Sequence, residues 1–314
     1  MRGGRRIRLG SRRSPMALAQ AHQVRHLLEG LGAGAEVEVV GIETSGDRWQ
    51  GDLAELGGKG AFMKEIDRAL VTEQVDVAVH CLKDVPGDVP PPAGLVFAAY
   101  LEREDTHDAL VLPVTSPYAC LADLPAGARI GSSSVRRKAQ LGRRRPDLSV
   151  HRFRGNVNSR LARLDEGAFD ALVLARAGLR RIGMEHRVSE VLPMRDMVPA
   201  VGAGVIAIQC RESDPGTVAL VRMLDHAQTR VQVTAERTML RGLQGHCNSP
   251  IAGHASVEPD GTLSLLGMVF SGDGGRFVRS HERAPAGQAA ELGARVAGDL
   301  LRKGAGDLIA GIPH

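Results

Sequence analysis

The first eighty residues alternate between apolar strand patterns and amphipathic helix patterns. Strands are predicted at residues 6–9, 37–42 and 75–80, and helices between them at residues 15–30 and 61–73. Ser14 and Pro15 supply a capping side chain and a proline at the first helical position. The order strand–helix–strand–helix–strand is typical of a doubly wound α/β domain, which binds ligands at the carboxyl ends of its strands.

A second series of the same kind follows a proline-rich break at residues 86–92. Its strands are predicted at residues 110–112, 129–131, 150–153 and 171–175, and its helices at residues 135–142 and 157–166. The Gly- and Val-rich residues 198–210 are expected to return to the first sheet as a crossing strand. The sequence therefore predicts two doubly wound domains joined by two crossings.

The pattern changes after about residue 230. A helix at residues 231–243 is followed by two antiparallel strands at residues 254–258 and 263–269, and by a last helix at residues 287–303. This is the pattern of a small α+β unit. We expect two α/β domains, residues 5–102 with 200–221 and residues 106–197, and an α+β domain at residues 226–314.

Charge is small overall but uneven along the chain. The chain has 40 basic and 36 acidic residues, and residues 129–160 hold nine Arg and one Lys against Asp147 alone. Such a stretch indicates an anionic partner. Aromatic residues make up 3% of the chain, which disfavours the base-stacking surfaces of nucleic-acid binders.

Hydropathy and cysteine spacing indicate the compartment. No apolar run reaches the roughly 18 residues that a membrane span needs, and the basic N-terminus lacks a signal-peptide core. The cysteines Cys81, Cys120, Cys210 and Cys247 are far apart and show no CxxC spacing. We therefore expect a cytoplasmic protein with no membrane, no metal and no disulfide framework, in which the first three cysteines are structural.

Cys247 lies in the polar segment Gly245-His246-Cys247-Asn248-Ser249-Pro250, directly after a predicted helix. A random cysteine is more often buried and inert, but a turn of this composition favours exposure. A neighbouring histidine can lower the pKa of a thiol. Cys247 is therefore a candidate for covalent attachment of a ligand.

Lys83 and Asp84 come just after the apolar strand at residues 75–80. Ligands of open α/β sheets bind at that edge, where a carboxylate can act as a general acid or stabilise a developing cation. The opposing interpretation is an aspartate that caps a turn beside an exposed lysine. The dipeptide by itself leaves these two interpretations about even.

Arginines and hydroxyls gather at three further strand ends. Ser132-Ser133-Ser134-Val135-Arg136-Arg137 begins a helix, and Arg154-Gly155-Asn156 and Arg12 with Ser14 occupy similar places. Helix starts of this kind bind anions, and the arginine fork matches carboxylates. A solvated basic face explains Arg143-Arg144-Arg145 better than it explains these loop arginines. Gly57-Gly58-Lys59-Gly60 lacks Walker A spacing and is interpreted as a flexible loop whose Lys59 reaches an anion.

Motifs spread from Arg8 to about Ala252 resemble the hydroxymethylbilane synthase family, also called porphobilinogen deaminase. They occur in the family's order and are Ser11-Arg12-Arg13-Ser14-Pro15-Met16-Ala17-Leu18-Ala19-Gln20, Gly57-Gly58-Lys59-Gly60-Ala61-Phe62, Val79-His80-Cys81-Leu82-Lys83-Asp84-Val85-Pro86, Gly131-Ser132-Ser133-Ser134-Val135-Arg136-Arg137 and Arg154-Gly155-Asn156-Val157. The last 60 residues carry little of the resemblance.

The resemblance implies a transferase that condenses four porphobilinogen molecules head to tail and releases ammonia each time. The product is 1-hydroxymethylbilane, which is passed to uroporphyrinogen-III synthase for tetrapyrrole synthesis. The family builds this product on a dipyrromethane cofactor bound through a thioether, and it acts as a monomer without nucleic acid. The implied fold is two domains like those of periplasmic binding proteins plus a small C-terminal domain.

Individual roles follow from the same resemblance. Asp84 is implied as the catalytic residue, and Cys247 as the residue that carries the thioether. The other implied cofactor contacts are Ser14, Lys83, Asp84, Ser132, Ser134, Arg136, Arg137, Arg154 and Gly155. The implied substrate contacts are Arg12, Gln20, Lys59, Arg154, Arg160 and Arg181.

Two positions depart from the family pattern. His246 stands where the family favours glycine before the cysteine, and Ala203 stands where the family has glutamine in Val-Gly-Gln-Gly. Neither change removes a catalytic group, and both bear on cofactor loading or hinge motion. Without the resemblance, the lobes and arginines would also suit an anion-binding module that needs no thiol. The basic stretch 129–160 would motivate a nucleic-acid binder as the third interpretation.

Overall fold

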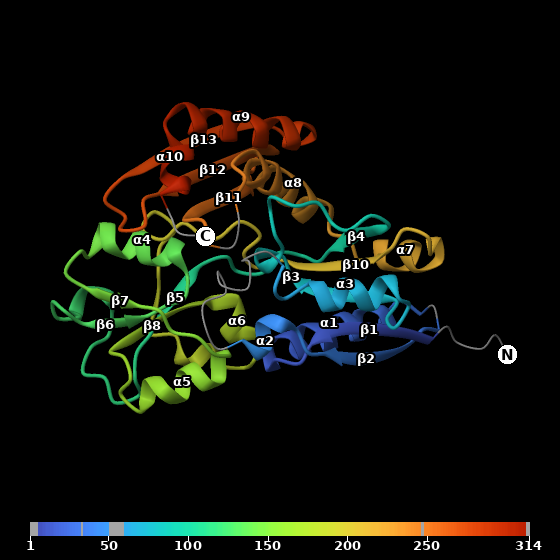
Figure 1. The fold of residues 1–314 in the computed structure, drawn as a ribbon, viewed down its shortest axis with the longest axis horizontal. Coiled ribbons are helices and arrows are strands. Elements are labelled where there is room, and N and C mark those ends of the chain that lie inside the picture. Colours follow the sequence, from blue (N-terminus) through green and yellow to red (C-terminus); the bar gives the residue numbers. More distant parts are fainter. Residues whose placement is uncertain (1–5, 33, 50–59, 246–247, 312–314) are drawn as a thin grey trace.

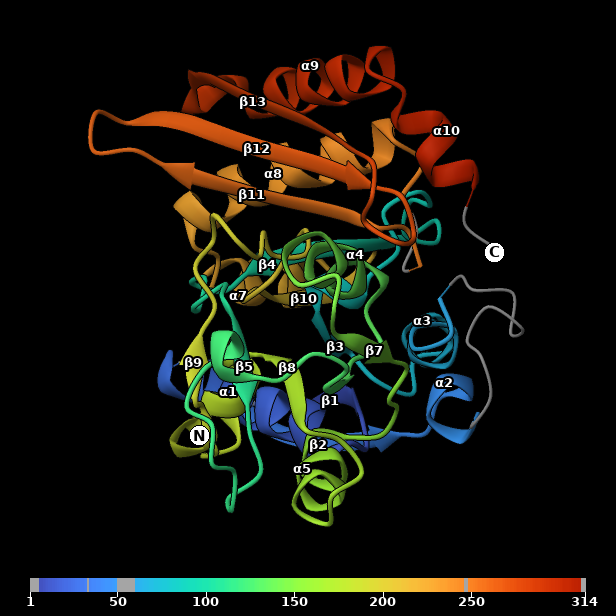
Figure 2. The same ribbon diagram turned by 90° about the vertical axis from the view of Figure 1, so that its left-hand side faces the viewer.

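The computed structural model describes residues 6–32, 34–49, 60–245 and 248–311. Within these ranges, two five-stranded sheets and one three-stranded sheet form three bodies, and Figures 1 and 2 show the C-terminal body lying across the other two. The predicted architecture, two α/β domains with a small α+β domain, is confirmed. The residue limits of the three domains stay predictions.

The first sheet has the order β2-β1-β3-β10-β4. Its strands are β1 (Arg6–Arg12), β2 (Glu36–Ile42), β3 (Val77–Cys81), β4 (Leu95–Tyr100) and β10 (Ile206–Arg211). Strands β1, β2 and β3 are parallel, and β10 pairs antiparallel with β3 and β4. The predicted return of the chain to this sheet is therefore confirmed.

Helices cover both faces of the first sheet. Helices α1 (Pro15–Gly30) and α7 (Pro215–Arg222) pack on one face, and α3 (Lys64–Val71) packs on the other. A short helix α2 (Ser45–Arg48) follows β2. Helix α3 begins three residues later than predicted, because residues 61–63 form a turn instead.

The second sheet repeats this plan with the order β7-β6-β8-β5-β9. Its strands are β5 (Asp108–Val111), β6 (Arg129–Gly131), β7 (Ser149–His151), β8 (Ala171–Ala175) and β9 (Glu190–Val191). Helix α4 (Val135–Arg144) packs on one face, and α5 (Val157–Asp165) and α6 (Arg176–Arg181) pack on the other. The sheet is thus enclosed on both faces, as its apolar strands require.

The third body packs α8 (Ala227–Gly242), α9 (Ala289–Arg302) and α10 (Ala305–Ala310) on an antiparallel sheet. The sheet contains β11 (Ile251–Val257), β12 (Thr262–Phe270) and β13 (Phe277–Pro285) in that order. The two predicted antiparallel strands are confirmed as β11 and β12, and the third strand, β13, was not predicted. Only Ser280 and Ala284 are buried along β13, so this edge strand lacks the apolar alternation that marks a strand in sequence.

A buried ion pair joins the crossings between the first two bodies to the third. The Arg103 guanidinium contacts the Glu236 carboxylate at 2.7 Å and also donates to the Ala203 carbonyl at 3.0 Å. The Glu236 carboxylate accepts from the backbone N–H groups of Gly202 and Ala255 as well. One carboxylate on α8 therefore holds both crossings and a strand of the third sheet. Among the described residues, no helix is long and apolar enough to cross a membrane.

Candidate active site

The predicted site residues lie at the carboxyl ends of parallel strands in two sheets. Strands β1 and β3 end at Arg12 and just before Asp84, while β6 and β7 end just before Ser132 and Arg154. Helix α1 of the first domain packs against α6 of the second, where the Met16 methyl lies 3.2 Å from the position of a Cβ on Gly178. The two sheet edges formed by these carboxyl ends, where ligands of α/β sheets bind, therefore lie against each other.

Asp84 ends a short 3-10 helix, Leu82–Asp84, directly after β3. Its start is fixed because the Leu82 N–H donates to the Val205 carbonyl at 3.0 Å and the Leu82 side chain is buried. Asp84 itself is partly exposed, and so is Lys83. The turn thus presents a carboxylate and an ammonium at the meeting edges while its apolar residue anchors it.

Arg160 of α5 brings a cation from the second domain to Asp84. The pKa of Arg160 is lowered to about 10, chiefly by burial and also by the nearby Arg137 guanidinium, while the Asp84 carboxylate opposes the shift. The guanidinium remains charged at neutral pH despite the shift. Arg160 and Asp84 therefore interact across the interdomain edge.

Arg181, Cys81 and Gln20 form a second contact across the domains. Burial lowers the pKa of Arg181, and the Cys81 side chain is among the groups that act on it. Arg181 donates from Nη2 to the Gly204 carbonyl at 3.0 Å, which ties α6 to a crossing segment. Burial raises the pKa of the Cys81 thiol, which lies beside the amide of the buried Gln20.

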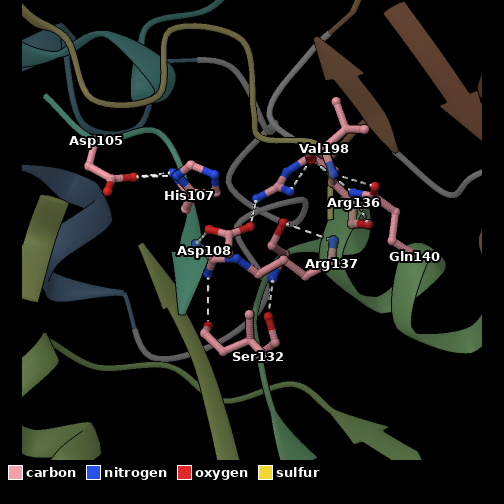
Figure 3. A network of polar contacts seen from close by, with 10 residues as sticks. Asp105, His107, Asp108, Ser132, Arg136, Arg137, Gln140 and Val198 are labelled. Atoms are coloured by element: carbon pink, nitrogen blue, oxygen red, sulfur yellow. Dashed lines mark hydrogen bonds and ion pairs between the residues drawn. The ribbon is translucent and has the colours of Figure 1, made fainter. Parts of the chain in front are cut away.

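Arg136 and Arg137 are held by a buried carboxylate of the chain itself. Asp108, the first residue of β5, contacts Arg136 at 2.6 Å and Arg137 at 2.7 Å, as Figure 3 shows. Burial by itself would raise the pKa of Asp108, but the two guanidiniums outweigh it and hold the pKa well below its usual range. The sequence reasoning missed Asp108, although an acid that opens an apolar strand was a signal for it.

The backbone around these arginines is set by capping side chains. Ser134 caps α4 by accepting from the Arg137 N–H at 3.4 Å, and Ser14 caps α1 by accepting from the Ala17 N–H at 3.3 Å. The buried Ser132 hydroxyl accepts from the Ser134 N–H. Gly155 has φ +121°, and a Cβ there would lie 2.7 Å from the Ser159 hydroxyl. A side chain at this position would be strained, so the turn that carries the partly exposed Arg154 needs glycine.

Some of the buried side-chain donors without an acceptor belong to the predicted site residues. Within the described ranges, five such nitrogens belong to predicted site residues: Gln20 Nε2 and the Nε atoms of Arg136, Arg137, Arg160 and Arg181. Buried donors usually have a partner, and leaving one unpaired costs about 1–3 kcal/mol. Their arrangement suits a ligand that carries several carboxylates, which is the chemistry of a dipyrromethane.

Two predicted site residues, Cys247 and Lys59, lie outside the described residues, as does His246. Arg12 is placed at the end of β1, where it binds Asp47 of α2 and lies under the ring of Phe62. Neither Asp47 nor Phe62 was singled out as a functional residue from the sequence.

Comparisons with known proteins match nearly the whole chain. Residues 7–219 match a family model described as the porphobilinogen deaminase dipyromethane cofactor binding domain, and residues 231–302 match the porphobilinogen deaminase C-terminal domain. Porphobilinogen deaminase 2 of Streptomyces coelicolor is 52% identical over 308 residues, which covers 98% of this chain and 97% of that protein.

Solved structures are more distant. The match to the methionine binding protein MetQ covers 70% of this chain and 89% of the MetQ chain. The two chains are 14% identical, and the TM-score is 0.43. The match to the periplasmic VFT2 domain of Bordetella pertussis BvgS covers 70% of this chain and 86% of the VFT2 chain. The two are 15% identical, and the TM-score is 0.40. The family matches and the S. coelicolor relative together span nearly the whole chain, so it belongs to the porphobilinogen deaminase family, the hydroxymethylbilane synthases, which are transferases of tetrapyrrole synthesis with a dipyrromethane cofactor.

Proposed function

We propose that Asp84 is the catalytic residue with which this chain condenses four porphobilinogen molecules into 1-hydroxymethylbilane. Each addition expels the aminomethyl nitrogen as ammonia and develops positive charge on the pyrrole. A carboxylate at that place stabilises the charge and moves the proton of the leaving nitrogen. The observation that supports this role is the position of Asp84 at the meeting edges, where its carboxylate interacts electrostatically with the partly buried Arg160.

Carboxylate binding falls to the donors around Asp84. Every pyrrole unit of substrate and cofactor carries an acetate and a propionate, so the site needs several fixed cations. The proposed cofactor contacts are Ser14, Lys83, Ser132, Ser134, Arg136, Arg137, Arg154 and Gly155, and the proposed substrate contacts are Arg12, Gln20, Lys59, Arg154, Arg160 and Arg181. The unpaired buried nitrogens of this set support the assignment. Because Asp108 offsets one of the two positive charges of Arg136 and Arg137, we expect Arg160 and Arg181 to supply more of the net attraction.

Cys247 is the proposed attachment point of the dipyrromethane, which supplies a covalent primer when bound. Support comes from contacts made by the residues that follow Asp84 and by those that precede Cys247. Arg237 of α8 donates to the Val85 carbonyl at 2.7 Å, next to Asp84 in sequence. A Cβ on Gly87 would lie 3.1 Å from the Gly245 carbonyl, two residues before Cys247. The segments that follow Asp84 and precede Cys247 are therefore in contact.

We also propose that the chain acts as a cytoplasmic monomer and passes its product to uroporphyrinogen-III synthase. The family relationship and the cysteine spacing support this proposal. Gel filtration with light scattering measures the mass of the particle, and a dimer would contradict the monomer.

Intact mass spectrometry tests the attachment site. Purified wild-type chain should be heavier than its sequence by one dipyrromethane, and Cys247→Ser should have its unmodified mass, because the hydroxyl is a poorer nucleophile than the thiol. Cys120→Ser, which changes a cysteine outside the proposed site, should keep the added mass. An added mass that persists in Cys247→Ser would place the thioether elsewhere, and a wild-type chain without turnover of porphobilinogen would contradict the proposed function.

A further inference from the structure

Arg12 is bound by a carboxylate of its own domain. Its Nε lies 3.1 Å and 3.2 Å from the two carboxylate oxygens of Asp47, and its Nη2 also donates to Oδ1. The two side chains are about three-quarters buried, with 24% and 22% of their surfaces exposed. A fork of this kind fixes the plane of the guanidinium as well as its position.

Asp47 is held in place independently of Arg12. Its Oδ2 accepts from the hydroxyl of the fully buried Thr44 at 2.7 Å and from the Thr44 N–H at 3.3 Å. The helix that carries it is attached to the next segment, because the Gly46 N–H donates to the Ala61 carbonyl at 2.8 Å and the Ser45 N–H to Glu65 at 3.0 Å. The carboxylate is therefore a fixed point to which the long arginine side chain is attached.

Phe62 covers one face of the same guanidinium. The Arg12 Cζ lies 3.9 Å from the centre of the ring, within the range of a cation–π contact. The ring also packs against α2 so closely that a Cβ on Gly46 would lie 2.4 Å from it. The inner edge and one face of Arg12 are thus occupied, and within the described ranges Nη1 makes no hydrogen bond.

The free edge of Arg12 lies at the ligand-binding edge of the sheet. Arg12 is the last residue of β1, which pairs parallel with β3, and Asp84 follows β3. Parallel strands end at the same edge of a sheet, so both residues are presented to the same side. Neither Asp47 nor Phe62 is needed to explain the chemistry at Asp84.

We propose that Asp47 and Phe62 are positioning residues that hold Arg12 so that its free edge binds a carboxylate of porphobilinogen. This rests on the proposed substrate-binding role of Arg12. A free arginine loses rotamer freedom when it is fixed, and a pre-oriented one loses less on binding. Burial would raise the pKa of Asp47, but the hydrogen bonds from Arg12 and Thr44 outweigh it and keep the carboxylate charged at neutral pH.

Steady-state kinetics of Asp47→Asn test the proposal. The amide keeps the shape of the side chain but loses the charge-assisted fork, so we expect KM for porphobilinogen to rise about tenfold while kcat changes less than about twofold. Glu38→Gln is the matched control, because it removes a 2.8 Å ion pair with Arg6 at the exposed surface. Arg6 lies on β1, the strand that also carries Arg12. Its KM should equal that of the wild type. An unchanged or lower KM in Asp47→Asn overturns the proposal.

A double-mutant cycle separates positioning from a general loss of structure. Arg12→Gln should raise KM by itself, and adding Asp47→Asn to it should have no further effect, because Asp47 acts only through Arg12. The same increase in both backgrounds would show that Asp47 acts otherwise. Phe62→Leu provides a second variant should Asp47→Asn fail to fold, and its KM should also rise only when Arg12 is present. A wild type that turns over porphobilinogen while Arg12→Gln has a normal KM would remove the role of Arg12 and leave the activity intact.

Discussion

At the scale of single residues, the site is defined by charges that the fold keeps partly unpaired. Asp84 stands in a turn whose apolar residue Leu82 is buried, and within the described part of the chain its carboxylate forms no ion pair. The Arg160 guanidinium of the other domain interacts with it electrostatically. A preorganised charge near the reacting atoms is the usual source of most of an enzyme's rate enhancement.

Asp84→Asn should keep the cofactor and slow the condensation by a factor on the order of 10², since the amide can neither move the proton nor stabilise positive charge equally well. Single-turnover consumption of porphobilinogen measures the rate, and intact mass confirms the loaded cofactor. Asp307→Asn on the exposed side of α10 should have the wild-type rate. Turnover equal to wild type in Asp84→Asn would exclude Asp84 from the mechanism.

At the scale of secondary-structure elements, ion pairs connect strand starts to helix starts. Asp108 begins β5 and holds two arginines of the first turn of α4, while Arg136 also donates to the Val198 carbonyl of a crossing segment at 2.6 Å. Figure 3 shows these groups converging between the strand and the helix. The start of α4 is thereby tied to both chain crossings.

Asp108→Asn should lower the free energy of unfolding by about 3–5 kcal/mol at pH 7, because two buried guanidiniums lose their counter-ion. The folded pKa of Asp108 is depressed, so its contribution is present above the unfolded pKa of about 3.9 and declines as pH falls below that value. Urea unfolding at several pH values should show the difference from wild type shrinking in acid. Asp170→Asn, which breaks a half-exposed pair with Arg129, should cost less than about 1 kcal/mol. A pH-independent difference would contradict the assignment.

At the scale of the whole molecule, one buried carboxylate joins three bodies. Glu236 on α8 binds Arg103 and Gly202, one in each crossing between the α/β domains, and Ala255 of the third sheet. Both Glu236 and Arg103 are nearly inaccessible to solvent, at 0% and 7% exposure. The third domain is therefore fastened at the crossings, where relative motion of the two α/β domains would have to occur.

Glu236→Gln should lower the free energy of unfolding by about 3–5 kcal/mol, because the Arg103 guanidinium would remain buried without its counter-ion. The midpoint of urea unfolding measures this change. The control is Glu282→Gln, which breaks a 3.0 Å pair with Arg295 at the surface and should change stability by less than about 1 kcal/mol. Equal stability of the two variants would show that the crossings are not held by Glu236.

The sequence by itself determined the order of elements and the strand ends that carry the chemistry. Alternating patterns, caps such as Ser14 and Ser134, and the motif around Asp84 are local, and the structure confirms the elements that they predicted. The polar edge strand β13 was missed because it buries too little apolar surface to leave a pattern.

Only the tertiary structure decided which charge meets which. Arg12 and Asp47 are 35 residues apart, and Asp108 and Arg136 are 28 apart, so no local spacing connects them. Such pairs exist because packing the helices on the sheets buries these side chains, and a buried charge without a partner is too costly to keep. The sequence determines which functional side chains the chain carries and which local elements present them. Which charges are neutralised, and how those side chains are oriented, depends on contacts that form only when distant segments pack together.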